Sequence, residues 1–232
     1  MEMEQKKYEF TGETMDFFGR TLHRIRSLRV FSDINVGDIG GWIEKEENLS
    51  HNNNAQVYGK AQVCGKARVG GDAQVFDDAQ VFGDAQVFGD ARVFGKVLIF
   101  GDAQVYGDAW VCGDAQVCGK ARVGDDARVF GNAQVCGKTW VGGRARLCGD
   151  ARIFCNHHYW TSPRIGSRND ITTFYRSKDR RIMVVCGCCH TDIEDFARRV
   201  KETHGDNQHA HDYEMAIQMA KIWIDLEGDI DE

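Results

Sequence analysis

The chain has 232 residues and a formal net charge of −6. This length suits two or three compact units, and the acidic balance argues against a dedicated nucleic-acid binder, which would carry a basic face. No apolar run approaches the roughly 18 residues of a membrane span, and the N-terminus lacks the basic-then-apolar order of a secretory signal. We therefore expect a cytoplasmic protein with neither a membrane nor a nucleic acid among its partners.

Residues 1–54 predict a β cap. The stretch 8–36 alternates enough for strands, but it does not keep a strict period of two, which indicates a bend or bulge. Paired glycines at 40–41 predict a tight turn. Trp42 and Ile43 then have the bulk to close the open end of a repeat structure, because a first repeat has no neighbour on one side.

A six-residue repeat fills residues 55–158. Val-Tyr-Gly-Lys-Ala-Gln at 57–62 is followed by Val-Cys-Gly-Lys-Ala-Arg, and the pattern runs without insertion to Ile153. So long a period indicates a solenoid. If three repeats make one triangular coil, residues 18 apart stack at about 4.8 Å. Positions one and five, Val and Ala, should then face inward, and Gly at position three should supply a left-handed corner.

Position two of the repeat predicts two outward columns of aromatic and sulfur side chains. An exposed apolar ladder of this length is unusual on a monomer, so it favours a subunit interface in a homo-oligomer, with a trimer as the expected state. The alternative is a ladder whose rings stack only on one another. The expected interface residues are Phe76, Phe94, Phe130, Phe82, Phe100 and Phe154.

Six of the nine cysteines lie in the repeats, five of them at position two, where other copies carry Phe or Tyr. We interpret a residue that exchanges with aromatics as space-filling, and the set as free thiols in a reducing cytosol. The six are Cys64, Cys112, Cys118, Cys136, Cys148 and Cys155.

Position four of one side stacks acidic residues down to Asp126 and ends in Arg144. Stacked like charges are destabilising, so a cation or a basic partner could lie there. Arg128 and Arg146, each two residues after a member of this column, favour a solvated face that is neutralised internally.

Residues 159–232 predict a small module of two strands and two helices. Residues 171–176 and 181–186 flank a polar turn and indicate a hairpin. Thr191 and Glu194 form a capping-box pattern that opens a helix, and a second helix is expected from near Asp212. So small a module has a thin core, and we expect it to pack on the solenoid or on a neighbouring chain.

Aromatic and cationic residues cluster in this otherwise acidic module. Aromatic rings stack on bases and guanidinium groups bind phosphates bidentately, so the cluster predicts a site for a small anionic, nucleotide-like ligand where the module meets the solenoid. The alternative is a solvated hairpin whose arginines pair with Asp192, Glu194 or Asp195. The candidate ligand-binding residues are Tyr159, Trp160, Arg164, Arg168, Tyr175, Arg176, Arg180 and Arg181.

A second cluster, Cys186, Cys188, Cys189 and His190, offers thiolates and an imidazole. Zinc ligands normally occur in Cys-x2–4-Cys pairs, which this spacing does not match. We therefore predict no metal and no cofactor, with zinc at these four residues as the alternative.

Residues 37–50, with Gly-Gly-Trp-Ile-Glu feeding into Val-Tyr-Gly-Lys-Ala repeats, resemble a family of bacterial and phage hexapeptide-repeat proteins often labelled acetyltransferases. The resemblance covers residues 8–158 and implies a left-handed, three-sided parallel β-helix. Transferases of this kind need a general-base His, usually on a loop that breaks the coils. This chain has no such loop, and His157 and His158 are the only candidates beside the coils. The resemblance also suggests a phage accessory factor, a class that includes proteins sequestering nucleotide immune signals.

The sequence thus predicts a mainly β fold with an N-terminal β cap (1–54), a hexapeptide-repeat β-helix (55–158) and a C-terminal ββαα module (159–232). The function we favour is a non-enzymatic oligomeric binding protein for a small anionic ligand. The alternatives are an acyl-CoA-dependent acyltransferase using His157 or His158, and a structural or protein-inhibiting scaffold.

Overall fold

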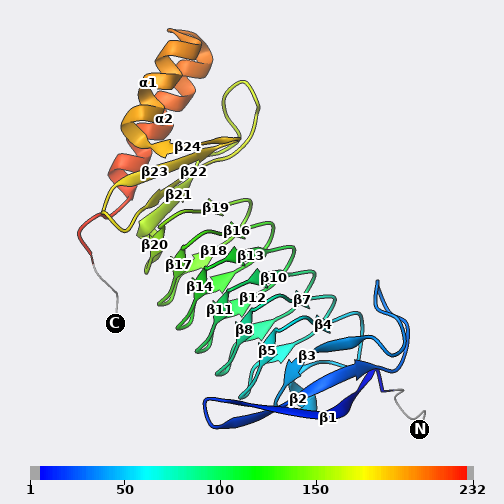
Figure 1. Cartoon of the computed structure of the whole chain (residues 1–232). Coiled ribbons are helices and arrows are strands. Elements are labelled where there is room, and N and C mark those ends of the chain that lie inside the picture. The colour runs from blue at the N-terminus through cyan, green and yellow to red at the C-terminus, as the bar shows by residue number, and fades with distance from the viewer. Residues whose placement is uncertain (1–5, 229–232) are drawn as a thin grey trace.

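The computed structural model describes residues 6–228, and its largest part is a three-sided parallel solenoid (Figure 1). Each coil adds one short strand to each side. The six-stranded side contains β4 (Gln56–Val57), β7 (Gln74–Val75), β10 (Arg92–Gly95), β13 (Trp110–Gly113), β16 (Arg128–Val129) and β19 (Arg146–Leu147). The five-stranded side contains β6 (Arg68–Val69), β9 (Gln86–Val87), β12 (Gln104–Val105), β15 (Arg122–Val123) and β18 (Trp140–Val141).

The third side belongs to a nine-stranded sheet that continues into the N-terminal cap. Its solenoid strands are β5 (Gln62–Val63), β8 (Gln80–Val81), β11 (Leu98–Ile99), β14 (Gln116–Val117), β17 (Gln134–Val135) and β20 (Arg152–Ile153). Its cap strands are β1 (Tyr8–Phe17), β2 (Arg20–Ser27) and β3 (Ile39–Ile43).

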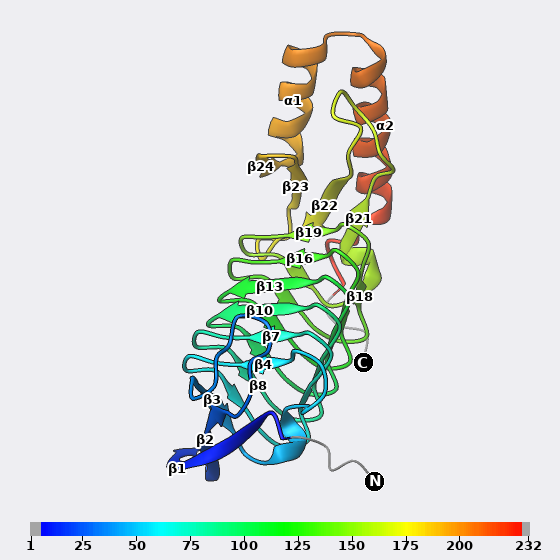
Figure 2. The ribbon, with the colours of Figure 1, turned by 90° about the vertical axis from the view of Figure 1, so that its right-hand side faces the viewer.

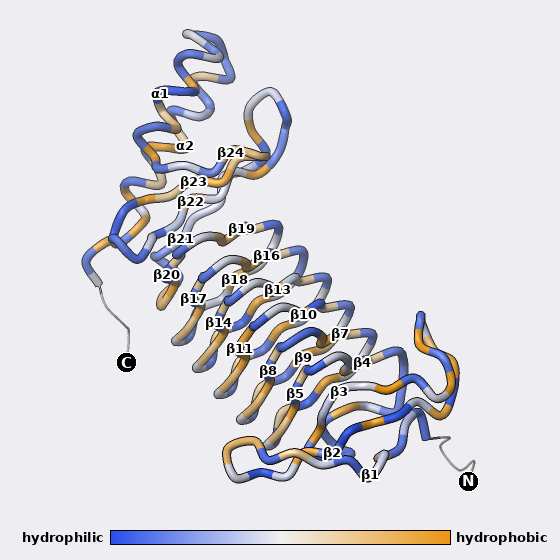
Figure 3. Tube along the Cα trace, viewed as in Figure 1, coloured by the Kyte–Doolittle hydropathy of each residue, from blue (hydrophilic) through white to orange (hydrophobic). Residues whose placement is uncertain are grey.

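The predicted 18-residue register is confirmed. Gln62 pairs with Gln80 in parallel, for example, and the same step recurs on every side. Val75 and Ala79 are completely buried, as positions one and five require. Figure 3 shows apolar and polar segments alternating along each coil and lining up from coil to coil. The core is therefore a continuous Val and Ala column, built from residues that no single coil could bury alone.

The position-two rings stack on one another. Tyr58, Phe76 and Phe94 follow each other with ring centroids 4.8 and 4.9 Å apart, and Phe82 and Phe100 lie 5.2 Å apart with nearly parallel planes. These rings, with Phe130 and Phe154, are half-buried. The geometry matches the self-stacking ladder, and coverage by a second subunit stays a prediction.

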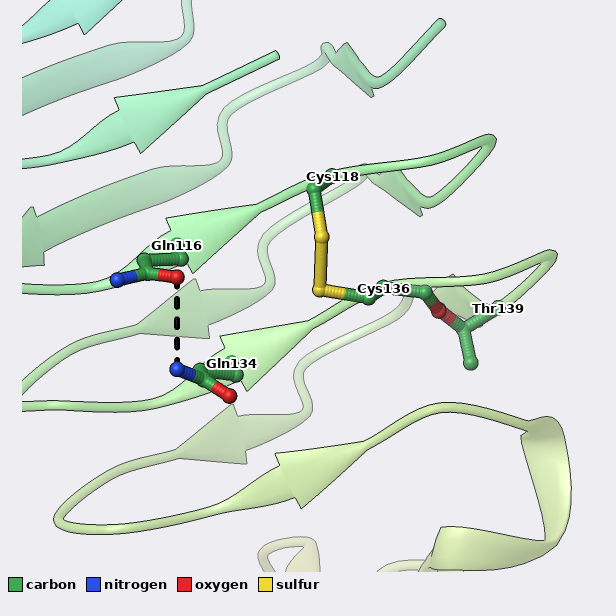
Figure 4. The surroundings of a disulfide bond; sticks show 5 residues. All are labelled: Gln116, Cys118, Gln134, Cys136 and Thr139. Atoms are coloured by element: carbon green, nitrogen blue, oxygen red, sulfur yellow. Dashed lines mark hydrogen bonds between the residues drawn. A yellow bond between two sulfur atoms is a disulfide. The ribbon is translucent and has the colours of Figure 1, made fainter. Parts of the chain in front are cut away.

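The prediction of free thiols is wrong for two of the repeat cysteines. Cys118 and Cys136 form a disulfide (Figure 4). They occupy position two of adjacent coils on the same side, which brings their Cα atoms to 4.5 Å, within the range a disulfide needs. Cys64, Cys112 and Cys148 remain thiols.

The N-terminal cap extends the third side across the base of the solenoid. β1 and β2 form an antiparallel hairpin with an irregularity between Phe10 and Thr14, and β3 pairs with β2 on one side and with β5 on the other. A short 3-10 turn, Glu46–Asn48, follows. The expected tight turn at 40–41 is wrong, because both glycines lie within β3. A Cβ at Gly40 would come within 2.5 Å of Ile25, so these glycines permit close packing.

The C-terminal module stands on the other end of the solenoid (Figures 1 and 2). The predicted hairpin is confirmed as β22 (Thr172–Arg176) and β23 (Ile182–Cys186). The structure adds β21 (Tyr159–Thr161), which follows a 3-10 turn at Asn156–His158, and β24 (Cys189–Asp192), giving a four-stranded antiparallel sheet. Alternate residues of β22 face opposite ways: Tyr175 joins the solenoid core, and Phe174 joins the core under the helices.

Both helices start at residues other than those predicted. Helix α1 (Ile193–His204) is capped by Asp192, whose side chain accepts the Asp195 amide, one residue beyond the predicted Thr191. Helix α2 (Gln208–Trp223) begins four residues before Asp212, because its first turn is polar and carries no apolar periodicity. Among residues 6–228, no helix combines the length and apolar character needed to cross a membrane.

A buried lysine gives the cap a pH-dependent stability. Lys7 Nζ donates to the Ala55 carbonyl at 2.7 Å and lies 4.9 Å from the Phe31 ring centre. Burial, followed by the charge of Arg29, lowers the pKa of Lys7 from 10.5 to about 8, against an opposing effect of Asp72. Because the folded pKa lies below the unfolded one, protonation favours unfolding, and the free energy of unfolding should rise with pH between the two values.

We therefore expect the contribution of Lys7 to the free energy of unfolding to rise by about 2 kcal/mol from pH 8 to pH 10. Urea unfolding of the wild type and of Lys7→Met across this range measures it. Tyrosine ionisation affects both proteins alike, so the difference between them isolates Lys7. Parallel pH profiles for the two proteins would contradict the assignment.

Candidate functional site

A polar pocket lies where the module meets the last coils of the solenoid. Its volume is about 320 Å³, and we call it the junction pocket. It is lined by Asp126, Arg128, Arg144, Arg146, Asp170 and Ile171. The first four come from the corner between the five-stranded and six-stranded sides, and the last two come from the loop between β21 and β22.

The repeat places these side chains together. Arg128 and Arg146 pair in register on β16 and β19, so their side chains leave the same face one coil apart. Asp126 and Arg144 occupy equivalent corners of the same two coils, 18 residues apart. Four charged groups that are distant in sequence thus share one corner, because the solenoid turns once every 18 residues.

Three guanidinium groups and two carboxylates line the pocket, which leaves an excess of positive charge. Arg144 forms an ion pair of 3.0 Å with Asp170. Arg128 lies over the indole of Trp110 at 5.0 Å, an arrangement that holds the cation by its attraction to the ring face.

Arg146 is the most firmly held of the three. Its NH1 donates to the Gly187 carbonyl at 3.0 Å, and its backbone amide donates to Thr173 Oγ1 at the same distance. Its Nε is buried and, within residues 6–228, has no hydrogen-bond partner. A buried N–H without an acceptor is costly, so an oxygen of a bound anion would relieve that cost.

The pocket has the chemistry of a binding site. Guanidinium groups offer paired donors that match phosphate or carboxylate oxygens. Neither histidine nor cysteine is among the residues that line it within the described chain. The arrangement can therefore hold an anion, and it supplies neither a thiol nucleophile nor an imidazole base.

The central members of the predicted ligand-binding cluster have structural contacts. Tyr175 is fully buried, and its hydroxyl contacts the Cys148 carbonyl at 3.1 Å and His190 Nε2 at 2.8 Å. Arg176 is buried and donates to the Gly228 carbonyl. Tyr159 donates to the Trp140 carbonyl, and Trp160 packs against the core under the helices.

The remaining four arginines lie in two loops at opposite ends of β22. Arg164 and Arg168 belong to the loop before this strand, and Arg180 and Arg181 to the turn after it. Arg181 lies 3.8 Å from Asp192, as the solvated-hairpin alternative anticipates. The sheet therefore does not gather the eight residues into one site. Arg168 comes nearest the junction pocket, since it contacts Gly187, whose carbonyl also binds Arg146.

The two histidines considered for acyl transfer have separate surroundings. His158 is buried, with Nδ1 contacted by the Phe154 amide and Nε2 by Arg176. Both ring nitrogens are thus engaged, and neither faces a pocket entrance. His157 is exposed and packs against Trp223 at 4.9 Å.

The Cys186, Cys188, Cys189 and His190 cluster is likewise dispersed. Cys186 lies 3.6 Å from the Tyr213 hydroxyl, Cys188 is exposed beside Arg168, and His190 contacts Tyr175. In the described part of the chain, no group of three or more His, Cys, Asp or Glu side chains is arranged to hold a metal ion. Burial raises the pKa of the Cys148 and Cys189 thiols, which keeps both protonated near neutral pH.

Three sides of stacked, in-register parallel strands define the chain as a β-solenoid protein. A family model described as the YdcK beta solenoid repeat matches residues 103–119 and 121–137, the middle coils of the solenoid. No curated protein matches the chain.

Proposed function

We propose that this chain is a hexapeptide-repeat binding protein, without enzymatic activity, that holds a small phosphate-bearing anion of nucleotide type in the junction pocket. The observation that supports it most is the buried Nε of Arg146, which faces no acceptor within residues 6–228. Arg128 and Arg144 line the same pocket, so a phosphate there would meet guanidinium donors from two adjacent coils.

The surrounding contacts favour binding over turnover. Arg146 is held by Gly187 and Arg128 by Trp110, so two of the three cations are preorganised before a ligand arrives. Asp126 and Asp170 oppose an anion. Their presence limits the affinity and also selects ligands with enough charge to displace the Arg144–Asp170 ion pair.

Isothermal titration with inorganic pyrophosphate and with ADP tests the proposal. Arg146→Met is expected to weaken binding at least tenfold, about 1.4 kcal/mol or more, the magnitude typical of hydrogen bonds to charged groups. Asp170→Asn should strengthen binding, because it removes a negative charge from the pocket. Affinity should also fall with added salt.

Arg122→Met is the matched control, since Arg122 is exposed on the five-stranded side and does not line the pocket. Arg144→Met is a second test variant that leaves the Arg146–Gly187 contact in place, in case the first variant loosens the module. A wild-type protein that binds neither ligand at millimolar concentration would refute the proposal, as would unchanged binding by both arginine variants.

The oligomeric state is a separate part of the proposal. We infer a homotrimer that forms through the ring columns of the solenoid sides. Native mass spectrometry measures the mass directly, and a monomer at micromolar concentration would remove this part without affecting the pocket. A phage origin and the sequestration of a nucleotide signal remain suggestions of the resemblance.

A further inference from the structure

The position-two column of the five-stranded side has a gap in its stack of rings. From the base upward the column reads Ser50, Gly70, Phe88, Tyr106 and Gly124. Phe88 and Tyr106 stack with centroids 5.5 Å apart and planes 13° from parallel. The place above them is already filled, because a Cβ on Gly124 would lie 2.3 Å from the Tyr106 ring. The place below Phe88, at Gly70, holds no side chain.

The backbone does not require glycine at position 70. The corner glycines of the repeat have positive φ, for example +65° at the neighbouring Gly71, but Gly70 is outside that region. A Cβ at Gly70 would meet only Ser50 Cβ, at 3.8 Å, which is ordinary contact. The gap is therefore open space beside an aromatic face, and close packing does not account for the glycine.

A cavity of about 490 Å³ occupies this gap, and we call it the Gly70 slot. Phe88 forms one of its walls and is 39% exposed. Ser50 lies on the coil below, where its amide donates to the Val69 carbonyl, so Phe88 and Ser50 are two coil steps apart. Two steps of about 4.8 Å leave room for one flat ring between them, at the spacing that the column already uses.

The rim of the slot carries polar groups of both kinds. Arg68 offers donors, Glu47 offers acceptors and Gln86 offers both. Arg68 and Gln86 are exposed, and within residues 6–228 their side chains make no hydrogen bond or ion pair. A ring stacked on Phe88 would present its edge to these groups.

We propose that the Gly70 slot binds a planar heteroaromatic ring of purine type, which stacks on Phe88 and continues the ring column. The flat gap selects a flat ring over a puckered sugar, and the mixed donors and acceptors of the rim match a purine edge. The site is three coils from the junction pocket, since Gly70 and Gly124 are 54 residues apart. It is independent of the anion proposed there.

Ligand-observed saturation-transfer NMR with adenosine tests this inference, because adenosine has a purine ring and no phosphate. The wild type should show transfer to the purine protons at millimolar ligand. Phe88→Leu should weaken binding about tenfold or more, in line with base–aromatic stacking. Gly70→Phe should abolish binding by filling the gap with a ring from the chain itself, and its Tm should not fall if that ring stacks.

Arg146→Met serves as the control and should bind adenosine as the wild type does. This separates the Gly70 slot from the junction pocket, so that either can fail alone. Absence of transfer in the wild type would overturn the inference. So would adenosine binding that survives both slot variants, or equal binding of methyl glucoside, which would show that a flat ring is not what the slot selects.

Discussion

Replacing Gly89 with alanine is expected to lower the free energy of unfolding by about 4 kcal/mol. Gly89 has φ of +74°, and a Cβ there would lie 2.8 Å from the Gly107 amide nitrogen and 3.0 Å from its carbonyl oxygen. The left-handed conformation costs an alanine about 1 kcal/mol or more, and pressing a methyl group into a neighbouring backbone adds about 1–3 kcal/mol. Urea unfolding followed by circular dichroism measures the loss.

Gly143→Ala is the matched control for this prediction. Gly143 also has a positive φ, +60°, but a Cβ there meets nothing within 4 Å. Only the conformational cost applies, about 1 kcal/mol. Equal losses for the two variants would show that the contact between coils does not matter, and that glycine is needed at the corner for its φ alone.

Tyr175→Ala is expected to cost about 4 kcal/mol, the range for deleting a large buried aromatic ring. Tyr175 is fully buried at the end of the solenoid core and is the main side chain through which β22 closes it. Hydrogen exchange should show faster opening of β19, β20 and β22, because these elements surround the cavity left behind. Coils near the base should exchange as in the wild type.

Tyr175→Phe separates the ring from its hydroxyl. It keeps the packing and removes the hydrogen bonds to Cys148 and His190, so a loss of about 1 kcal/mol is expected. If the phenylalanine variant were as unstable as the alanine variant, the polar contacts and not the plug would hold the module on the solenoid.

The solenoid could be predicted because each repeat position has a single structural role. Val at position one and Ala at position five are buried, and Gly at position three has positive φ, as do its replacements Asp77 and Asp125. The paired glycines at 40–41 show the limit of this reasoning. Glycine serves both turns and close packing, and only the position of Ile25 across the sheet distinguishes the two uses.

The disulfide could have been found from the sequence. Cys118 and Cys136 are 18 residues apart, and the register that stacks the rings also stacks these thiols. Exchange with aromatics at position two suggested space-filling alone. That interpretation treated each position separately and missed that two cysteines follow each other in one column.

The junction pocket needed information that the repeat does not contain. The register relates Arg128 to Arg146, but Asp170 reaches them only because the loop before β22 folds back over the last coils. The cluster predicted in the module failed to converge for a related reason. Neighbours along a strand point to opposite faces, so Tyr175 and Arg176 turned to different surroundings.

The 18-residue register also makes the molecule a ruler of adjustable length. The cap and the module each contact only the coils nearest to them, so the number of coils between them can change without altering either end. Each added or removed set of 18 residues would move the Gly70 slot and the junction pocket apart or together by one strand spacing, about 4.8 Å. Relatives with different numbers of coils would therefore hold the same two end structures at separations that differ in fixed steps.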